Sequence, residues 1–333
     1  MGKVSEDKII DVKNLVKYFP VYSRGVIFKK KIGDVHAVDD VTFYVKRGET
    51  FALVGESGCG KTTTARLVLN LISPTSGEVL VDGVPIYKIF ESKDVQEQKK
   101  LRRKMQIIFQ NPYGSLDPRM TVYDIISEAF IIHKHVPQEE WKERVYKLLE
   151  LVGLEAYHAE RYPHEFSGGQ RQRICIARAL AVEPDFIVAD EPVSSLDVSI
   201  RAQILNLLGD LQKNINLTYL YISHDLSSVR QISHRVAVMY LGKIVEYADT
   251  DYLFDHPLHP YTRALIDAVP IPDPKIMVKK IVLGGEVPSP INPPSGCRFH
   301  PRCPRVQPIC SREEPQLLER KENHNVACHF PLE

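Results

Sequence analysis

The sequence predicts an α/β protein whose core is a parallel sheet, joined by an antiparallel β layer, a helical subdomain and a proline- and cysteine-rich C-terminal extension. Three observations point to this class. Apolar runs of strand length alternate with helix-length segments, residues 9–50 contain short strand-like runs separated by turns, and prolines crowd the chain after about residue 250. With 333 residues, the chain is long enough for a sizeable core.

Local periodicity places the main elements. Strands alternate apolar and polar residues, whereas helices repeat apolar residues every three to four positions. Helical periodicity is clearest inside an insert between residues 110 and 167. On this basis we expect strands at 35–45 and 77–83, helices at 141–152, 171–181 and 197–212, and a hairpin at 235–247 that turns near Leu241-Gly242.

A glycine-rich loop follows a strongly apolar run. Residues 55–63, Gly-Glu-Ser-Gly-Cys-Gly-Lys-Thr-Thr, have the spacing of a phosphate-binding P-loop. Residues 51–54 before it predict a buried strand, and residues 64–69 after it predict a helix. Backbone N–H groups of such a loop surround phosphate oxygens, and the helix N-terminus adds positive potential. The alternative is a glycine-rich turn that merely joins the strand to the helix.

The loop predicts a site for MgATP. Lys61 would reach the β- and γ-phosphates, and the hydroxyl of Thr62 would bind Mg²⁺. The residues expected to contact the nucleotide are Gly55, Ser57, Gly58, Cys59, Gly60, Lys61, Thr62 and Thr63.

Two adjacent carboxylates end another apolar run. Asp190 and Glu191 follow residues 186–189, which predict a core strand. Carboxylates at the end of a buried strand are costly unless they meet a cation or a proton. Asp190 would hold Mg²⁺ through water, and Glu191 would act as the general base for the attacking water. The alternative is a solvated acidic turn before Pro192.

A second anion-binding helix start lies between these motifs. Ser167, Gly168, Gly169 and Gln170 open a predicted helix, with their N–H groups available to an anion. A chain with one P-loop has no use for this group in its own site. The group makes sense where two such chains face each other and each caps the other's ATP.

With these motifs in this order, the sequence resembles the ATP-binding subunits of ABC transporters over about residues 9–250. Residues 166–170 match the family's signature motif, with Phe166 in place of the usual leucine. The resemblance implies further roles. Gln110 would be the Q-loop glutamine that touches Mg²⁺ or water, Asp197 would lie in the loop crossing the dimer interface, and His224 would be the switch histidine that reads the γ-phosphate. Phe19, with Tyr18 next, would stack on adenine.

Segments beyond the ATP motifs resemble one branch of the family, the ATPases of dipeptide and oligopeptide importers. They are residues 111–118, 256–263 and 297–304. Nickel importers look similar, so peptide specificity rests on resemblance alone. We expect an ATPase domain at 1–250, with its helical subdomain at about 111–168, and a C-terminal extension at 251–333. Its prolines, Pro270, Pro272 and Pro274 among them, favour an extended tail laid over a surface.

Four of the six cysteines lie in this tail: Cys297, Cys303, Cys310 and Cys328. Four thiolates can bind zinc or an iron–sulfur cluster, and the wide gaps between them suit a larger group better than zinc. The resemblance also favours a [4Fe–4S] cluster, while zinc and free thiols remain alternatives. His300, His324 and His329 keep a mixed zinc site open. The remaining two cysteines are Cys59, in the P-loop, and Cys175, expected to be a small core residue.

Composition is that of an ordinary globular protein, with 44% hydrophobic residues, 26% charged residues and a formal net charge of +1. There is no basic stripe for nucleic acid, no export signal in residues 1–8 and no run of about 18 apolar residues. We therefore expect a peripheral protein at the cytoplasmic face of the cell membrane. Its expected partners are a second ATPase subunit, a paralogue with which it forms a heterodimer, two separate permease subunits and, indirectly, an external peptide-binding protein. The rival interpretation is a soluble ATPase of the same family that acts on DNA or the ribosome.

Overall fold

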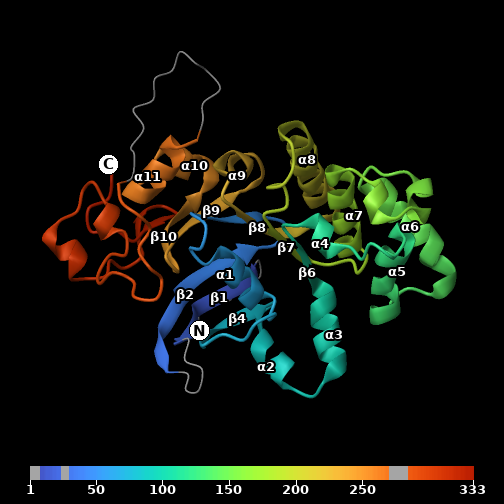
Figure 1. Ribbon diagram of the computed structural model, residues 1–333, viewed down its shortest axis with the longest axis horizontal. Coiled ribbons are helices and arrows are strands. Elements are labelled where there is room, and N and C mark those ends of the chain that lie inside the picture. Colours follow the sequence, from blue (N-terminus) through green and yellow to red (C-terminus); the bar gives the residue numbers. More distant parts are fainter. Residues whose placement is uncertain (1–7, 24–29, 270–283) are drawn as a thin grey trace, which may run out of the picture. The chain divides into compact units, whose positions relative to one another are not determined.

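The computed structural model describes residues 8–23, 30–269 and 284–333, which form two compact units. Unit 1 comprises Met1–Ile9, Val45–Thr50 and Ile86–Ile222, and unit 2 comprises Ile10–Tyr44, Phe51–Pro85 and Ser223–Glu333. Figure 1 labels helices and strands of both units. The N-terminal segment predicted to lack an export signal and the prolines at 270, 272 and 274 fall almost entirely outside the described residues.

The core of unit 1 is a set of parallel strands. Strand β7 (Phe186–Asp190) pairs with β6 (Met105–Ile108) on one side and with β8 (Thr218–Ser223) on the other. Every residue of β7 and β8 is buried, as expected for parallel strands covered on both faces. Helices α7 (Gly168–Leu180) and α8 (Val198–Ile215) belong to the same unit. The strand predicted at residues 186–189 is confirmed as β7. Helix α7 begins three residues earlier than expected, because Ser167 rather than Gln170 caps it.

The insert in unit 1 is helical, as its periodicity predicted. It contains α4 (Pro112–Ser115), α5 (Val122–His133) and α6 (Trp141–Leu151), and α2 (Ile86–Glu91) and α3 (Val95–Lys104) precede it. Thr121 and Asp124 form a capping box that starts α5, since each side chain accepts a hydrogen bond from the other's backbone N–H.

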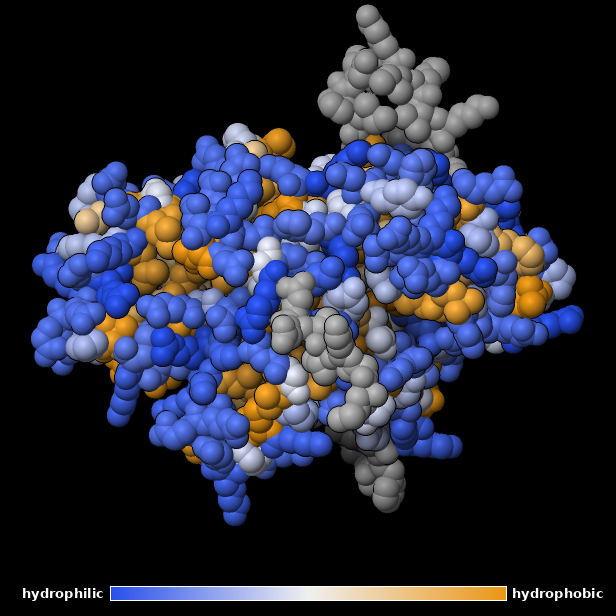
Figure 2. All heavy atoms as spheres, turned by 180° about the vertical axis from the view of Figure 1, so that it is seen from behind, coloured by the Kyte–Doolittle hydropathy of each residue, from blue (hydrophilic) through white to orange (hydrophobic). Residues whose placement is uncertain are grey.

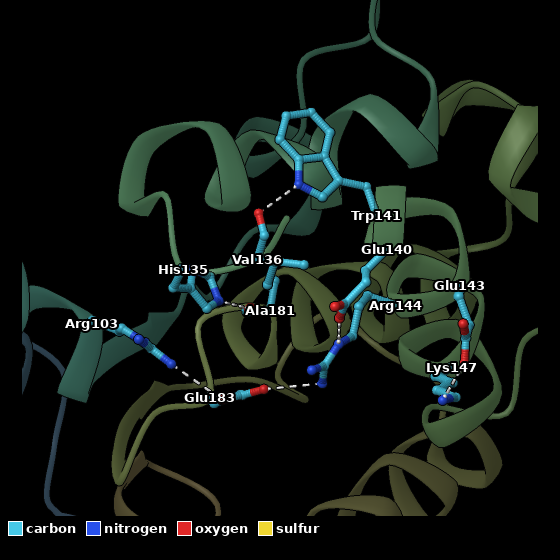
Figure 3. Close-up of polar contacts among 10 residues, drawn as sticks. All are labelled: Arg103, His135, Val136, Glu140, Trp141, Glu143, Arg144, Lys147, Ala181 and Glu183. Carbon is cyan, nitrogen blue, oxygen red and sulfur yellow. Dashed lines mark hydrogen bonds and ion pairs between the residues drawn. The ribbon is translucent and has the colours of Figure 1, made fainter. Parts of the chain in front are cut away.

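Polar contacts connect the turn after α7 with α3 and with the segment from α5 to α6 (Figure 3). Glu183, just beyond α7, pairs with Arg103 of α3 at 3.2 Å and with Arg144 of α6 at 3.3 Å. His135 contacts the Ala181 carbonyl through Nε2 at 3.1 Å, and the Trp141 indole donates to the Val136 carbonyl at 3.0 Å. The ion pairs are exposed and contribute little individually, so burial of the apolar faces holds these helices together.

Unit 2 contains a mixed sheet. Strand β3 (Thr50–Val54) is parallel to β9 (Arg235–Tyr240), which forms the predicted hairpin with β10 (Lys243–Asp249). The turn lies at Leu241 and Gly242, both at positive φ. Strands β12 (His324–Val326) and β11 (Leu318–Lys321) continue the sheet beyond β10.

A separate antiparallel sheet forms the predicted β layer. Its order is β2 (Lys31–Lys46), β1 (Lys8–Tyr22), β4 (Ser76–Val81) and β5 (Val84–Pro85). Helix α1 (Lys61–Val68) follows the P-loop, and unit 2 also contains α9 (Leu226–Ile232), α10 (Thr250–Asp255) and α11 (Pro260–Asp267).

The prediction of an extended tail was wrong for those described residues after 250 that form helices and strands. Pro260 does not prevent a helix, because it occupies the first turn of α11, where its missing N–H would have no helical partner. The end of the chain forms β11 and β12 because the edge of β10 offers unpaired backbone groups that β12 satisfies. The number of prolines had indicated extended structure, but the position of a proline within a helix determines whether the helix can form.

No helix in the described ranges is long and apolar enough to cross a membrane. On the face shown in Figure 2, hydrophilic side chains predominate and hydrophobic ones form separate patches.

Candidate nucleotide site

The P-loop has backbone geometry that its glycines alone permit. Gly55 and Gly60 have φ of 152° and 110°. A Cβ at Gly55 would lie 2.2 Å from the Met239 carbonyl oxygen, and one at Gly60 would lie 2.1 Å from that of Ala37. Both contacts are with rigid backbone, so any larger residue would displace the loop. The structure therefore gives the predicted strand–loop–helix arrangement, with β3 before the loop and α1 after it.

Lys61 is folded back onto the loop that precedes it. Its ammonium donates to the carbonyl oxygens of Gly55 at 2.7 Å and Glu56 at 3.0 Å, and the residue is only 5% exposed. Burial raises the pKa of the neighbouring Cys59 thiol, which the Lys61 charge only partly opposes. Cys59 is therefore a neutral thiol, and a buried cation lies at the N-terminus of α1 where phosphates would bind.

In unit 1, Gln110 and Glu191 lie in direct contact. The Gln110 amide donates to the Glu191 carboxylate at 2.8 Å, although 81 residues separate them. Glu191 has φ of 49°, a conformation that non-glycine residues seldom adopt and that recurs at functional sites. Asp190, the last residue of β7, is 7% exposed. Strands β6 and β7 are parallel neighbours, so their carboxyl ends bring Gln110 to the two acidic residues.

The signature residues form a capped helix start. The Ser167 hydroxyl accepts from the Gln170 N–H at 3.3 Å, and the Gln170 side chain accepts from the Ser167 N–H at 3.0 Å. A Cβ at Gly169 would lie 2.4 Å from the Ile200 side chain, which explains the glycine there as close packing of α7 on α8. Gly168 and the Ser167 hydroxyl remain at the start of the helix, where a partner's phosphate could approach.

Three other predicted residues occupy separate positions. Asp197 occupies the N-cap position of α8, but its side chain makes no capping hydrogen bond. Val198 beside it is 81% exposed. His224 is exposed after β8, in unit 2. Phe19 is 38% exposed, whereas Tyr18 is engaged: its hydroxyl donates to Asp39 at 2.6 Å and its ring lies 4.1 Å from that of His36. Phe19 is thus the freer of the two candidate rings for adenine.

Comparison with known proteins assigns the family. A family model described as ABC transporter matches residues 38–194, and one described as oligopeptide/dipeptide transporter, C-terminal region, matches residues 245–310. The oligopeptide transport ATP-binding protein AppF of Bacillus subtilis is 51% identical over 332 residues, covering 99% of each chain. The chain belongs to the ABC transporter family. A probable peptide ABC transporter ATP-binding protein of Sinorhizobium fredii, y4tS, is 50% identical and covers 97% of this chain and 90% of its own.

Solved ABC structures share the fold. The ATP-binding cassette MJ0796, a dimer in a post-hydrolysis state bound to ADP and Pi, is 29% identical, with a TM-score of 0.62, and covers 72% of this chain and 98% of its own. The protein cbiO1 from Clostridium perfringens is 30% identical, with a TM-score of 0.63, and the match covers 75% of this chain and 92% of cbiO1. The fold predicted from the sequence is confirmed, and the chain is an ABC ATPase that uses ATP and Mg²⁺.

The four tail cysteines of this ABC ATPase line one small cavity in unit 2. Burial, with a smaller contribution from neighbouring cysteines, raises the pKa of Cys297 and of Cys328 to about 11. Within the described residues, however, no group of three or more His, Cys, Asp or Glu side chains is arranged to hold a metal ion. Four thiols are a donor set that suits a soft metal or a cluster.

The three histidines proposed for a mixed zinc site have other contacts. His324 is fully buried and donates from Nε2 to Glu246 at 2.6 Å. Nδ1 of His300 is 2.9 Å from the Cys297 carbonyl oxygen, and Nε2 of His329 is 2.9 Å from that of Glu313. His300 and His329 line the cavity of the four cysteines, and His324 is not among its lining residues.

Sequence reasoning missed the contacts between the extension and the P-loop. Tyr261 and Arg302 both reach Glu56, the second residue of the loop. These residues lie 205 and 246 positions from it, and nothing local in the sequence marks them as neighbours.

Proposed function

We propose that this chain is an ATP-hydrolysing subunit of an importer for dipeptides or oligopeptides. The support is the naming of relatives that match it along nearly their full length, together with the match of residues 245–310 to the oligopeptide/dipeptide transporter C-terminal region. ATP hydrolysis at a head-to-tail dimer of ATPase subunits would drive separate permease subunits. The substrate itself would be selected by the permease and an external binding protein.

The residues of the P-loop would hold the nucleotide. Backbone N–H groups of the loop would surround the phosphates, and Lys61 would exchange its two carbonyl partners for phosphate oxygens. Thr62, Asp190 and Gln110 would bind Mg²⁺ directly or through water. Phe19 would stack on adenine. His224 would contact the γ-phosphate.

Contact between Gln110 and Glu191 is the observation that carries this proposal. A glutamine amide and a carboxylate on neighbouring parallel strands can orient one water molecule between them and the phosphate. Glu191 would take the proton of that water, and Gln110 would hold the carboxylate in position. The positive φ of Glu191 lies directly after the last residue of β7, where the extended backbone ends.

Two substitutions test these roles in the assembled transporter. Glu191→Gln should bind MgATP normally, lose turnover by about 10²-fold or more and accumulate a closed dimer. Lys61→Ala should weaken binding itself. Near-normal turnover of Glu191→Gln would remove Glu191 from the role of base, and undiminished ATP binding by Lys61→Ala would remove the P-loop as the site.

The assembly we propose contains two ATPase subunits that are paralogues of each other and two transmembrane permease subunits. Asp197 and the signature residues would face the partner's ATP, and the exposed Val198 next to Asp197 is an apolar side chain suited to such an interface. Tyr113, 65% exposed and three residues after Gln110, is suited to contact a permease. The complex would place this chain at the cytoplasmic face of the cell membrane, with no role for nucleic acid.

For the C-terminal extension, residues 251–333, we propose a [4Fe–4S] cluster held by the four cysteines, beside an ATPase domain at 1–250. Four thiols around one cavity support it. The cluster would favour the thiolate forms that burial disfavours. Protein purified without oxygen should contain iron and sulfide and absorb broadly near about 400 nm. Stoichiometric zinc without iron would favour the alternative, and metal-free protein would leave free thiols.

A further inference from the structure

An ion pair joins the P-loop to the C-terminal extension. Arg302 donates from Nη1 to one oxygen of the Glu56 carboxylate at 2.8 Å and from Nη2 to the other at 3.1 Å. This is the two-pronged geometry in which arginine binds a carboxylate most strongly. The Arg302 side chain is 8% exposed and that of Glu56 is 26% exposed, so the pair is better shielded from solvent than an ordinary surface pair.

The surroundings of the pair fix its position. The Tyr240 hydroxyl lies 3.4 Å from Nη1 of Arg302. The Tyr261 hydroxyl accepts the backbone N–H of Glu56 at 2.9 Å. Phe299, three residues before Arg302, packs its ring against those of Tyr240 and Tyr261, at 5.3 Å and 5.4 Å between centroids. The extension therefore holds Glu56 at two points, its backbone and its carboxylate.

The charge of Glu56 makes this contact significant for nucleotide binding. A P-loop closes around phosphate groups that carry several negative charges. A carboxylate on the same loop lies within about a Debye length of them and would repel them if it were unpaired. Arg302 of the extension neutralises that carboxylate and holds it through two hydrogen bonds.

We propose that Arg302 is a positioning residue of the nucleotide site, which holds and neutralises Glu56 so that the C-terminal extension is required for full ATP affinity. This inference rests on the proposed role of the P-loop in binding MgATP. Arg302 itself does not touch the nucleotide in this scheme. It acts through Glu56, and its effect should disappear when the charge of Glu56 is removed.

The experiment measures the Kd of a fluorescent ATP analogue with Mg²⁺ for the full chain and four variants. Arg302→Gln should weaken binding by on the order of tenfold, the effect of one uncompensated charge several ångströms away at the dielectric typical of a protein surface. Glu56→Gln alone should bind at least as tightly as the wild type. The double variant Arg302→Gln with Glu56→Gln should return to within about threefold of the wild type. Arg312→Gln, at an exposed arginine of the same extension, is the matched control and should change nothing.

The rescue by Glu56→Gln separates this role from simple docking of the extension. If Arg302→Gln binds ATP like the wild type, the proposal is overturned. If the double variant is as weak as Arg302→Gln, Arg302 acts by folding the extension and the charge argument is wrong. Failure of the proposed function would look different, because Lys61→Ala would then bind ATP as well as the wild type does.

Discussion

Glu246 should be the most sensitive single position in the C-terminal half of the protein. It lies on β10 and is fully buried. One carboxylate oxygen accepts from the Leu258 N–H at 2.6 Å and from His324 Nε2 at 2.6 Å, and the other accepts from the His259 N–H at 2.9 Å. One side chain thus joins β10 to the segment entering α11 and to β12.

The number of donors gives the magnitude. Glu246→Ala leaves two backbone N–H groups and one imidazole N–H buried without an acceptor, each costing about 1–3 kcal/mol before relaxation. Because the surroundings will partly rearrange, we expect a loss of about 3–5 kcal/mol in the free energy of unfolding. Glu246→Gln can keep one oxygen for Leu258 and His324 but turns an amide N–H₂ toward the His259 N–H. It should therefore cost about 1–3 kcal/mol, the penalty of one orphaned donor.

Chemical denaturation followed by far-UV circular dichroism measures these losses, with limited proteolysis to show whether the extension detaches. The protein's single tryptophan, Trp141, belongs to unit 1 and its fluorescence should report that unit separately. Glu322→Gln, an exposed carboxylate between β11 and β12, is the control and should change stability by less than about 0.5 kcal/mol. A Glu246→Ala variant as stable as this control would refute the reasoning.

Three further predictions concern the signature helix, the helical subdomain and the cysteines. Ser167→Arg should lower hydrolysis at the partner's P-loop and leave ATP binding by the isolated chain unchanged; loss of binding in the isolated chain would assign Ser167 to its own site. Burial, with the nearby Arg103 charge, lowers the pKa of His135, whose Nδ1 is buried without a hydrogen-bond partner, so the folded state disfavours the protonated ring. The contribution of the neutral His135 ring to the free energy of unfolding is present above the ordinary histidine pKa of about 6.5 and is lost as pH falls below it. This loss is no more than about 1 kcal/mol because the ring is partly exposed. His135→Gln should flatten that part of the stability–pH curve, and an unchanged curve would contradict the assignment. Cys303→Ser should remove any bound iron and increase proteolysis of the extension, with ATP affinity reduced only if Arg302 is displaced; retention of full iron content would exclude Cys303 as a ligand.

The local motifs could be predicted from the sequence because their function depends on a few adjacent residues. Gly55 and Gly60 have positive φ, a local backbone conformation that favours glycine, and the uninterrupted apolar run of β7 is typical of a strand buried on both faces. Periodicity likewise gave α6 nearly to the residue. In each case the physical cause is local, so the sequence carries it directly.

Contacts between distant segments were decided only by tertiary structure. The sequence alone did not pair Glu56 with Arg302, and the proline count of the tail concealed β12, which forms because the edge of β10 needs a partner. The contact of His324 with Glu246, a carboxylate on another strand, was likewise not predicted from the sequence. Such contacts depend on which surfaces the fold brings together. A contact between residues 78 or 246 positions apart produces no periodic pattern in the sequence from which it could be predicted.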